Sequence, residues 1–125
     1  MTTQRTLPAC PDKPNCVSSQ APAGDSQHAI APLAFAGDAD RAWGALQRAI
    51  SAMPRTRILS DGHGYLHAEA TSLIFRYVDD VECLLDRAAS VIHVRSASRV
   101  GYGDMGVNRK RVERLRERFS RELAG

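Results

Sequence analysis

The segment from Arg95 to Arg109 carries the residues best suited to chemistry. It reads RSASRVGYGDMGVNR, so small polar residues at the end of an expected strand lead through a glycine-containing turn to the start of an expected helix. Free backbone N–H groups at a helix start, with arginine side chains beside them, can hold a phosphate, sulfate or carboxylate. The candidate residues for this anion site are Arg95, Ser96, Ser98, Arg99, Gly101, Asp104, Asn108 and Arg109.

A structural turn is the alternative for this segment. Asp104 could itself satisfy the helix start and order one of the neighbouring arginines, which counts against a simple anion cradle. No Gly-Lys-Ser/Thr follows at the Walker A spacing, so a nucleotide-binding P-loop is not predicted. Asn108 is expected to be the N-cap of the helix.

A second candidate site follows two expected strands. Alternation places one row of polar side chains outward from the sheet: His67, Glu69, His93, Arg95 and Arg99. Two histidines and a glutamate could form an enzyme site or a metal site, whereas a cross-strand ion-pair network is the more ordinary account. The sequence has no Gly-x-Ser-x-Gly, His-Glu-x-x-His or EF-hand pattern. The balance leans against an enzyme, and we expect neither a cofactor nor a metal.

The state of the first two cysteines depends on the redox potential of the compartment. Cys10 and Cys16 are separated by five residues, two of them prolines. This spacing permits a local disulfide in an oxidising compartment, whereas both thiols would stay free in a reducing one. No second cysteine pair completes a zinc site, and the redox spacing Cys-x-x-Cys is absent. Cys83 stands among apolar residues and is expected to be buried.

Two helices and a group of strands must position these residues. Apolar residues recur every three or four positions over 38–53 and over 108–123, so the sequence predicts a helix in each range. Alternation predicts strands at Tyr65–Thr71 and Val91–Arg99, while Leu73–Leu85 is either one strand or a hairpin. The order helix, strands, helix predicts the fold class α+β. We expect a single two-layer domain, with an antiparallel sheet of about four to five strands and both helices on one face.

The first part of the chain differs in composition. Residues 1–37 hold five of the six prolines, so we expect an irregular, proline-rich N-terminal arm packed on a body formed by residues 38–125. The chain has 125 residues, of which 43% are hydrophobic and 25% charged, as in ordinary single globular domains. The longest mostly apolar stretch, residues 29–36, is too short to span a bilayer, and no secretory signal precedes it.

The charge is concentrated in the final helix. The whole chain has a net charge of +3, while residues 108–123 hold seven bases against three acids. Helical geometry predicts that the solvent face carries Lys110, Arg111, Arg114, Arg118 and Arg121, and that Arg109 and Arg116 lean toward the sheet. This helix is either an ordinary solvated face or a surface for an anionic partner. Nucleic acid is not favoured, because aromatic stacking residues are missing beside the bases.

Several stretches together resemble one known family. They are residues 10–19 (CPDKPNCVSS), 65–69 (YLHAE), 75–82 (FRYVDDVE), 94–101 (VRSASRVG), 104–109 (DMGVNR) and 111–116 (RVERLR). They are similar to domain-of-unknown-function family 1499. The resemblance covers nearly the whole chain and implies a compact bacterial-type α+β domain, often exported or membrane-tethered, with no established activity, cofactor or catalytic residue.

Two departures from the family pattern bear on the interpretation. Many relatives have a bulky aromatic residue where Cys83 stands, which supports a packing role for that thiol. Many also carry a membrane or export segment before the first cysteine, and none is seen here. The absence of a signal indicates the cytoplasm, whereas the resemblance indicates the periplasm or a membrane association.

The leading hypothesis is a small non-catalytic domain that binds an anionic small molecule or protein near the Arg95–Arg109 segment. One alternative is an enzyme with its site on the polar sheet face, at His67, Glu69 and His93. The other is a scaffold or assembly protein that uses its basic C-terminal helix. The sequence does not indicate an oligomeric state or the identity of a ligand.

Overall fold

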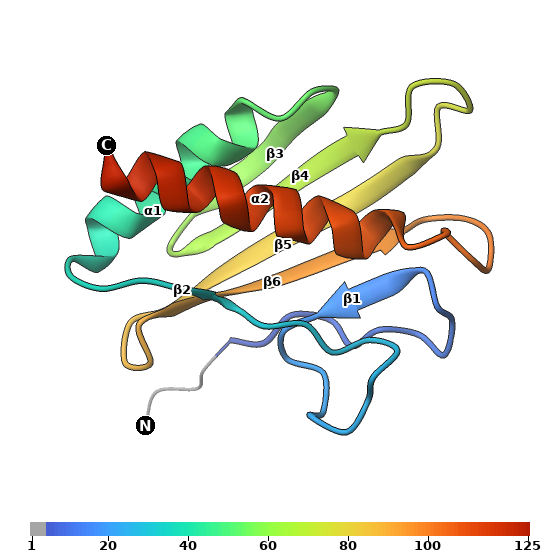
Figure 1. The fold of residues 1–125 in the computed structure, drawn as a ribbon, viewed down its shortest axis with the longest axis horizontal. Coiled ribbons are helices and arrows are strands. Elements are labelled where there is room, and N and C mark those ends of the chain that lie inside the picture. Colours follow the sequence, from blue (N-terminus) through green and yellow to red (C-terminus); the bar gives the residue numbers. More distant parts are fainter. Residues whose placement is uncertain (1–4) are drawn as a thin grey trace.

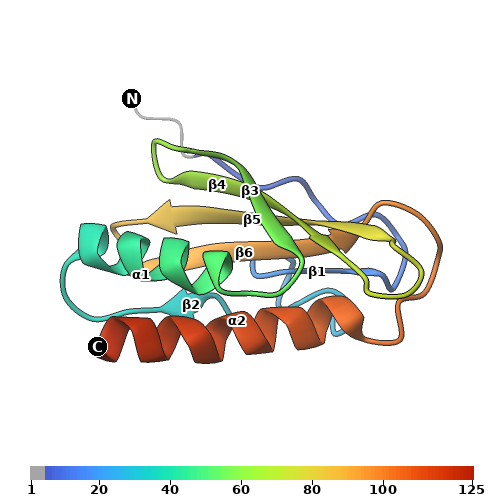
Figure 2. The same ribbon diagram turned by 90° about the horizontal axis from the view of Figure 1, so that it is seen from above.

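The protein is a two-layer α+β domain. The computed structural model describes residues 5–125. In chain order the elements are β1 (Cys16–Ser18), β2 (Leu33–Ala34), α1 (Ala39–Ser51), β3 (Thr56–Gly62), β4 (Tyr65–Thr71), β5 (Val78–Asp86), β6 (Val91–Ser98) and α2 (Val107–Ala124). All strand pairs are antiparallel, in the order β1-β6-β5-β4-β3, with β2 also paired to β6. Both helices lie on one face of the sheet, as predicted (Figures 1 and 2).

The described sheet has six strands, more than the four to five that the sequence predicts. The additional strands, β1 and β2, lie in the proline-rich N-terminal segment, whose first four residues are outside the described part of the chain. Neither strand contains a proline, and at three and two residues they are too short to show an alternating pattern. They form because β6 offers a free edge, where Cys16 pairs with Ala97 and Leu33 with Ile92.

The two helices form where the apolar periodicity predicts them. The Asp38 carboxylate accepts a hydrogen bond from the Arg41 N–H at 2.8 Å, so Asp38 caps α1. The apolar stripe of α2 is buried at Val112, Leu115 and Phe119 and packs with α1 against the sheet. No helix within residues 5–125 is long and apolar enough to cross a membrane.

The range Leu73–Leu85 is neither one strand nor a hairpin. Residues 72–77 form a loop, and a single strand, β5, follows it. Asp79 and Asp80 lie within this strand and face opposite sides of the sheet, as adjacent strand residues must. The Asp79 carboxylate binds Arg111 from α2, and the Asp80 carboxylate binds His67 on the other face.

Two loops project from the same end of the sheet. The β4–β5 loop (residues 72–77) begins after Thr71, which pairs with Val78. The β6–α2 loop (residues 99–106) begins beside it, because the Arg99 N–H donates to the Val78 carbonyl at 3.3 Å. We call this end of the molecule the loop end; it lies on the right in Figures 1 and 2.

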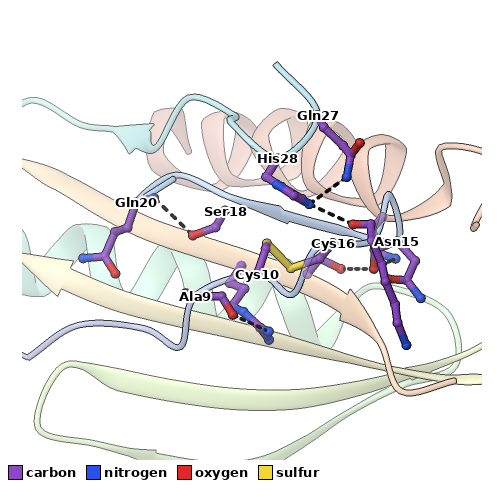
Figure 3. Close-up of a disulfide and its surroundings, with 12 residues drawn as sticks. Ala9, Cys10, Asn15, Cys16, Ser18, Gln20, Gln27 and His28 are labelled. Atoms are coloured by element: carbon purple, nitrogen blue, oxygen red, sulfur yellow. Dashed lines mark hydrogen bonds between the residues drawn. A yellow bond between two sulfur atoms is a disulfide. The ribbon is translucent and has the colours of Figure 1, made fainter. Parts of the chain in front are cut away.

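Cys10 and Cys16 form a disulfide, with their Cα atoms 5.7 Å apart (Figure 3). Cys16 is fully buried and begins β1, so the bond ties the preceding loop to the sheet. Cys83 is free and buried in the core, as expected. Burial raises the pKa of the Cys83 thiol, which keeps it protonated.

Breaking the disulfide should destabilise the domain. Closure of so short a loop contributes roughly 2 kcal/mol in the chain-entropy account. We expect Cys10→Ser/Cys16→Ser to lower the free energy of unfolding by that amount in urea titrations. Reductant should lower the stability of the unmodified protein equally and leave the double variant unchanged. Equal stability of the oxidised and reduced protein would contradict this expectation.

Candidate functional site

The β6–α2 loop is organised by one buried side chain, that of Asn108. The residue has no exposed surface. Its Oδ1 accepts hydrogen bonds from the Ser96 hydroxyl at 2.6 Å and the Arg111 guanidinium at 2.9 Å. Its Nδ2 contacts three acceptors within 3.2 Å: the Asn15 carbonyl, Ser98 Oγ and Asp104 Oδ2. Asn108 therefore connects the N-terminal segment, β6 and α2.

Asn108 is not the N-cap, contrary to the prediction. Gly106 occupies that position, with a φ of 77° that a glycine adopts without strain. The capping hydrogen bonds come from Asp104, which accepts from the N–H groups of Gly106 at 2.8 Å and Asn108 at 3.1 Å. The helix begins one residue before Asn108 and turns its side chain inward, where the buried acceptors are.

Asp104 fills the N-terminus of α2, the place where an anion was expected. Burial alone would raise its pKa, but hydrogen bonds from the Asn108 side chain and from the N–H groups of Asn108 and Gly106 bring that pKa below its usual value. The carboxylate is therefore charged near neutral pH and neutralises the helix dipole. It makes no ion pair with a neighbouring arginine among the described residues, which corrects the expectation that it orders one of them.

The predicted anion-site residues separate onto two sides of the sheet. Ser96 and Ser98 face the helices and bind Asn108. Arg95 and Arg99 face the opposite side, because alternate residues of a strand point in opposite directions. Gly101 lies in the loop beyond β6, where its carbonyl accepts from the Asn15 side chain at 2.9 Å.

Arg109 holds the N-terminal segment. Its guanidinium donates to the carbonyls of Ala29 at 3.0 Å, Gln27 at 3.2 Å and Ser26 at 3.4 Å. No acid pairs with it among residues 5–125, so its positive charge meets only carbonyl dipoles. A hollow of about 270 Å³ lies beside it, lined by Pro14, Val17, Gln27, Gly103, Asp104, Met105, Gly106 and Arg109.

Arg111 is not on the solvent face, contrary to the prediction. Its side chain is 12% exposed and forms an ion pair with Asp79 at 2.8 Å. Helical side chains lean toward the N-terminus of their helix, and this brings the long arginine back to the strand ends. The wheel projection missed the contact because it takes no account of that lean. Arg116 reaches the carbonyls of Ala31 and Pro32, beside β6.

The outward polar row forms a cross-strand ion-pair network. His67 contacts Asp80 at 2.7 Å, and Arg99 also contacts Asp80, at 2.8 Å. Glu69 lies between Arg99 and Arg57 and is bonded to both. Hydrogen bonds from Arg99 lower the pKa of Asp80 and, together with Arg57, the pKa of Glu69.

His93 lies apart from His67 and Glu69. The strand β5 runs between β4, which carries His67, and β6, which carries His93, so the two backbones are about 10 Å apart. The His93 ring contacts Ser19 Oγ at 3.1 Å and the Asp86 carboxylate at 3.6 Å. Within residues 5–125, no group of three or more histidines, cysteines or carboxylates is placed to hold a metal ion.

The Arg95 side chain lies beneath the N-terminal segment and is 12% exposed. Its guanidinium contacts Glu82 at 3.3 Å and the Ala9 carbonyl at 3.3 Å, and Glu82 also accepts from the Tyr65 hydroxyl at 2.6 Å. Burial, and then the Glu82 carboxylate, raise the pKa of Tyr65. Arg95 Nε is the one buried side-chain nitrogen or oxygen without a partner in the described part of the chain.

Comparison with known proteins identifies a family. The model of a family described as a protein of unknown function (DUF1499) matches residues 6–119, nearly the whole chain. No curated protein matches the sequence.

Removal of the Asn108 side chain should destabilise the fold strongly. Asn108→Ala removes the acceptor of the buried Ser96 hydroxyl and one of the two donors to the Asn15 carbonyl, and we expect a loss of roughly 3 kcal/mol in the free energy of unfolding. Ser120→Ala, on the exposed face of the same helix, is the control and should change stability by about 0.5 kcal/mol or less. Similar losses in both variants, measured by urea unfolding, would show that the network adds nothing.

The Asp80–Arg99 pair should contribute to acid sensitivity. Because the folded-state pKa of Asp80 is depressed, its contribution is present above the unfolded value of about 4 and is lost as the pH falls through the folded value. Arg99→Gln should therefore flatten the decline of stability between about pH 5 and pH 2. Arg121→Gln removes an exposed pair on α2 and should leave the profile unchanged. Unfolding free energies measured at several pH values check both variants.

Proposed function

The chain belongs to the family of proteins of unknown function DUF1499, and we propose that this member is a non-catalytic domain that binds an anionic ligand or partner near the Arg95–Arg109 segment. The contact surface is the loop end together with the first turns of α2. The supporting observation is an imbalance of partners: the acids near this segment are already bonded, while several bases are not.

The acids near the segment have their partners within the domain. Asp79 is paired with Arg111, and Asp80 and Glu82 are paired with Arg99 and Arg95. The remaining acid of the β6–α2 loop, Asp104, is bonded to the N-terminus of α2. Each of these carboxylates is therefore compensated before any partner arrives.

Three other basic residues in the first turns of α2 have no such acidic partners in the described part of the chain. Lys110 and Arg114 are exposed on successive turns of α2 and have no acidic partner among the described residues. Arg109 adds a charge that only carbonyls contact. An anionic partner would meet these three charges on the surface. Because Asp104 fills the helix N-terminus, the geometry favours a partner on the outside over a small anion held by backbone N–H groups.

Support for a non-catalytic role comes from the polar sheet face. His67 and Glu69 are bonded to charged neighbours, and His93 lies on the far side of β5. Such saturation is typical of a structural ion-pair network, in which no side chain is left to act on a substrate.

The proposal predicts weaker binding to a polyanion when the unpaired bases are removed. We expect Lys110→Gln/Arg114→Gln to bind heparin about tenfold more weakly than the unmodified protein at low salt, since exposed charge contacts are screened by ions. Elution from a heparin column and a solution titration with heparin measure this.

The matched control removes the same charge elsewhere. Arg41→Gln/Arg87→Gln lowers the net charge equally at exposed positions, in the first turn of α1 and in the β5–β6 turn. Both segments lie at the end of the molecule away from the loop end (Figure 1). This variant should keep nearly all of its heparin affinity. The proposal fails if the two variants lose the same affinity, because binding would then follow net charge alone.

A further inference from the structure

Exposed apolar side chains gather at the loop end. Within residues 5–125, the large hydrophobic residues that are exposed are Leu59, Leu73, Ile74, Phe75, Tyr77, Val100, Tyr102, Met105 and Val107. All except Leu59 lie in the β4–β5 loop, in the β6–α2 loop or at the first residue of α2. Ile74 is 79% exposed and Met105 is 94% exposed. Concentration of this kind marks an interaction surface, because single exposed apolar residues are normally scattered.

Hydrogen bonds hold the β4–β5 loop in this form. Ser72 closes it twice: its N–H donates to the Tyr77 carbonyl at 2.9 Å, and its hydroxyl accepts from the Tyr77 N–H at 2.8 Å. Outside this closure, the rings of Phe75 and Tyr77 stack on each other with their centroids 5.7 Å apart. The loop thus presents its aromatic rings as one unit.

The β6–α2 loop is also anchored from behind. The Asn15 side chain donates to the carbonyls of Gly101 at 2.9 Å and Val100 at 3.4 Å. Asp104 secures the other end of the loop through its bonds to α2. The side chains of Tyr102 and Met105 remain outside these contacts and are exposed.

Positive charge accompanies the apolar side chains. Arg76 lies between Phe75 and Tyr77 in the sequence, and Lys110 and Arg114 follow the second loop on α2. Neither loop contains an acid except Asp104, whose charge is taken up by the helix N-terminus. Residues 72–77 and 99–114 together hold six bases and two acids, and two of the bases, Arg99 and Arg111, are paired with acids of the sheet.

We propose that the two loops dock this end of the protein on the surface of an anionic lipid bilayer. The apolar side chains enter the boundary between headgroups and acyl chains, and the bases contact lipid phosphates and carboxylates. Aromatic rings with a polar edge, such as those of Tyr77 and Tyr102, are favoured at that depth. This inference rests on the proposed function and specifies its anionic partner.

The arrangement of the loops favours a bilayer over a protein partner. They leave neighbouring strand ends and project from the same end of the sheet (Figures 1 and 2), so a flat surface can meet both. Bases behind an apolar tip match the layering of a bilayer, in which charged headgroups lie outside the apolar interior.

Vesicle co-sedimentation tests the inference. The vesicles are phosphatidylcholine alone or phosphatidylcholine with about a third phosphatidylserine, since the polybasic contribution needs anionic lipid. We expect the unmodified protein to bind the anionic vesicles and to bind the neutral ones at least tenfold more weakly. Ile74→Ser/Phe75→Ser and Tyr102→Ser/Met105→Ser should each reduce binding to anionic vesicles about tenfold, because each pair removes apolar area that enters the membrane.

Leu59→Ser is the matched control, because it removes an exposed apolar side chain from β3, outside both loops. It should bind as the unmodified protein does, and circular dichroism melts should show all variants folded. Equal loss in Leu59→Ser and in the loop variants overturns the inference.

The heparin measurements separate the two proposals. Heparin binding that needs Lys110 and Arg114, with no binding to either vesicle, overturns the membrane inference and leaves the proposed function in place. If the unmodified protein binds neither heparin nor anionic vesicles, both the proposed function and the membrane inference are overturned. A dimer that forms in solution and is lost in the loop variants, with no vesicle binding, assigns the loops to a second copy of the chain and also overturns the inference.

Discussion

The fold depends on the buried Asn108 side chain, which joins three parts of the molecule in one place. Helix packing alone places α2 over the sheet through its apolar stripe. Asn108 fixes the position of α2 along β6, because its amide donates to the Asn15 carbonyl and the Ser98 hydroxyl at one point along that strand. A buried polar group with every partner in place stabilises one arrangement over its neighbours, since any shift leaves donors and acceptors unpaired. The loop end therefore has a defined shape.

Alternate residues of β6 take part in different interactions on the two faces of the sheet. Its even-numbered serines contribute to the buried network, and its odd-numbered arginines contribute to the ion pairs on the other face. Its free edge also receives both N-terminal strands. One strand thus separates a neutral polar interior from a charged exterior, so residues adjacent in the sequence belong to different interaction networks.

Much of this architecture could be predicted from the sequence, because periodicity reports which face of an element is buried. Both helices, the alternating strands and the antiparallel two-layer fold follow from it. Contacts between side chains that are distant in the sequence could not be predicted in this way. The inward turn of Asn108, the ion pair of Arg111 with Asp79 and the pairing of β1 depend on partners distant in the chain. The apolar residues 73–75 carried a signal too, but their β-branched and aromatic character made them resemble part of a strand.

The pairing of β1 with β6 also constrains the order in which the chain can assemble. β1 is made first, yet its partner strand and the Asn108 amide, 93 residues after Asn15, appear only near the end of synthesis. Contacts this distant in sequence form slowly, because a long loop must close before they stabilise anything. The Cys10–Cys16 bond spans six positions and needs none of the later chain. In an oxidising compartment it can close first, so that β1 enters the late docking step with the preceding loop already closed and incurs a smaller entropic cost there.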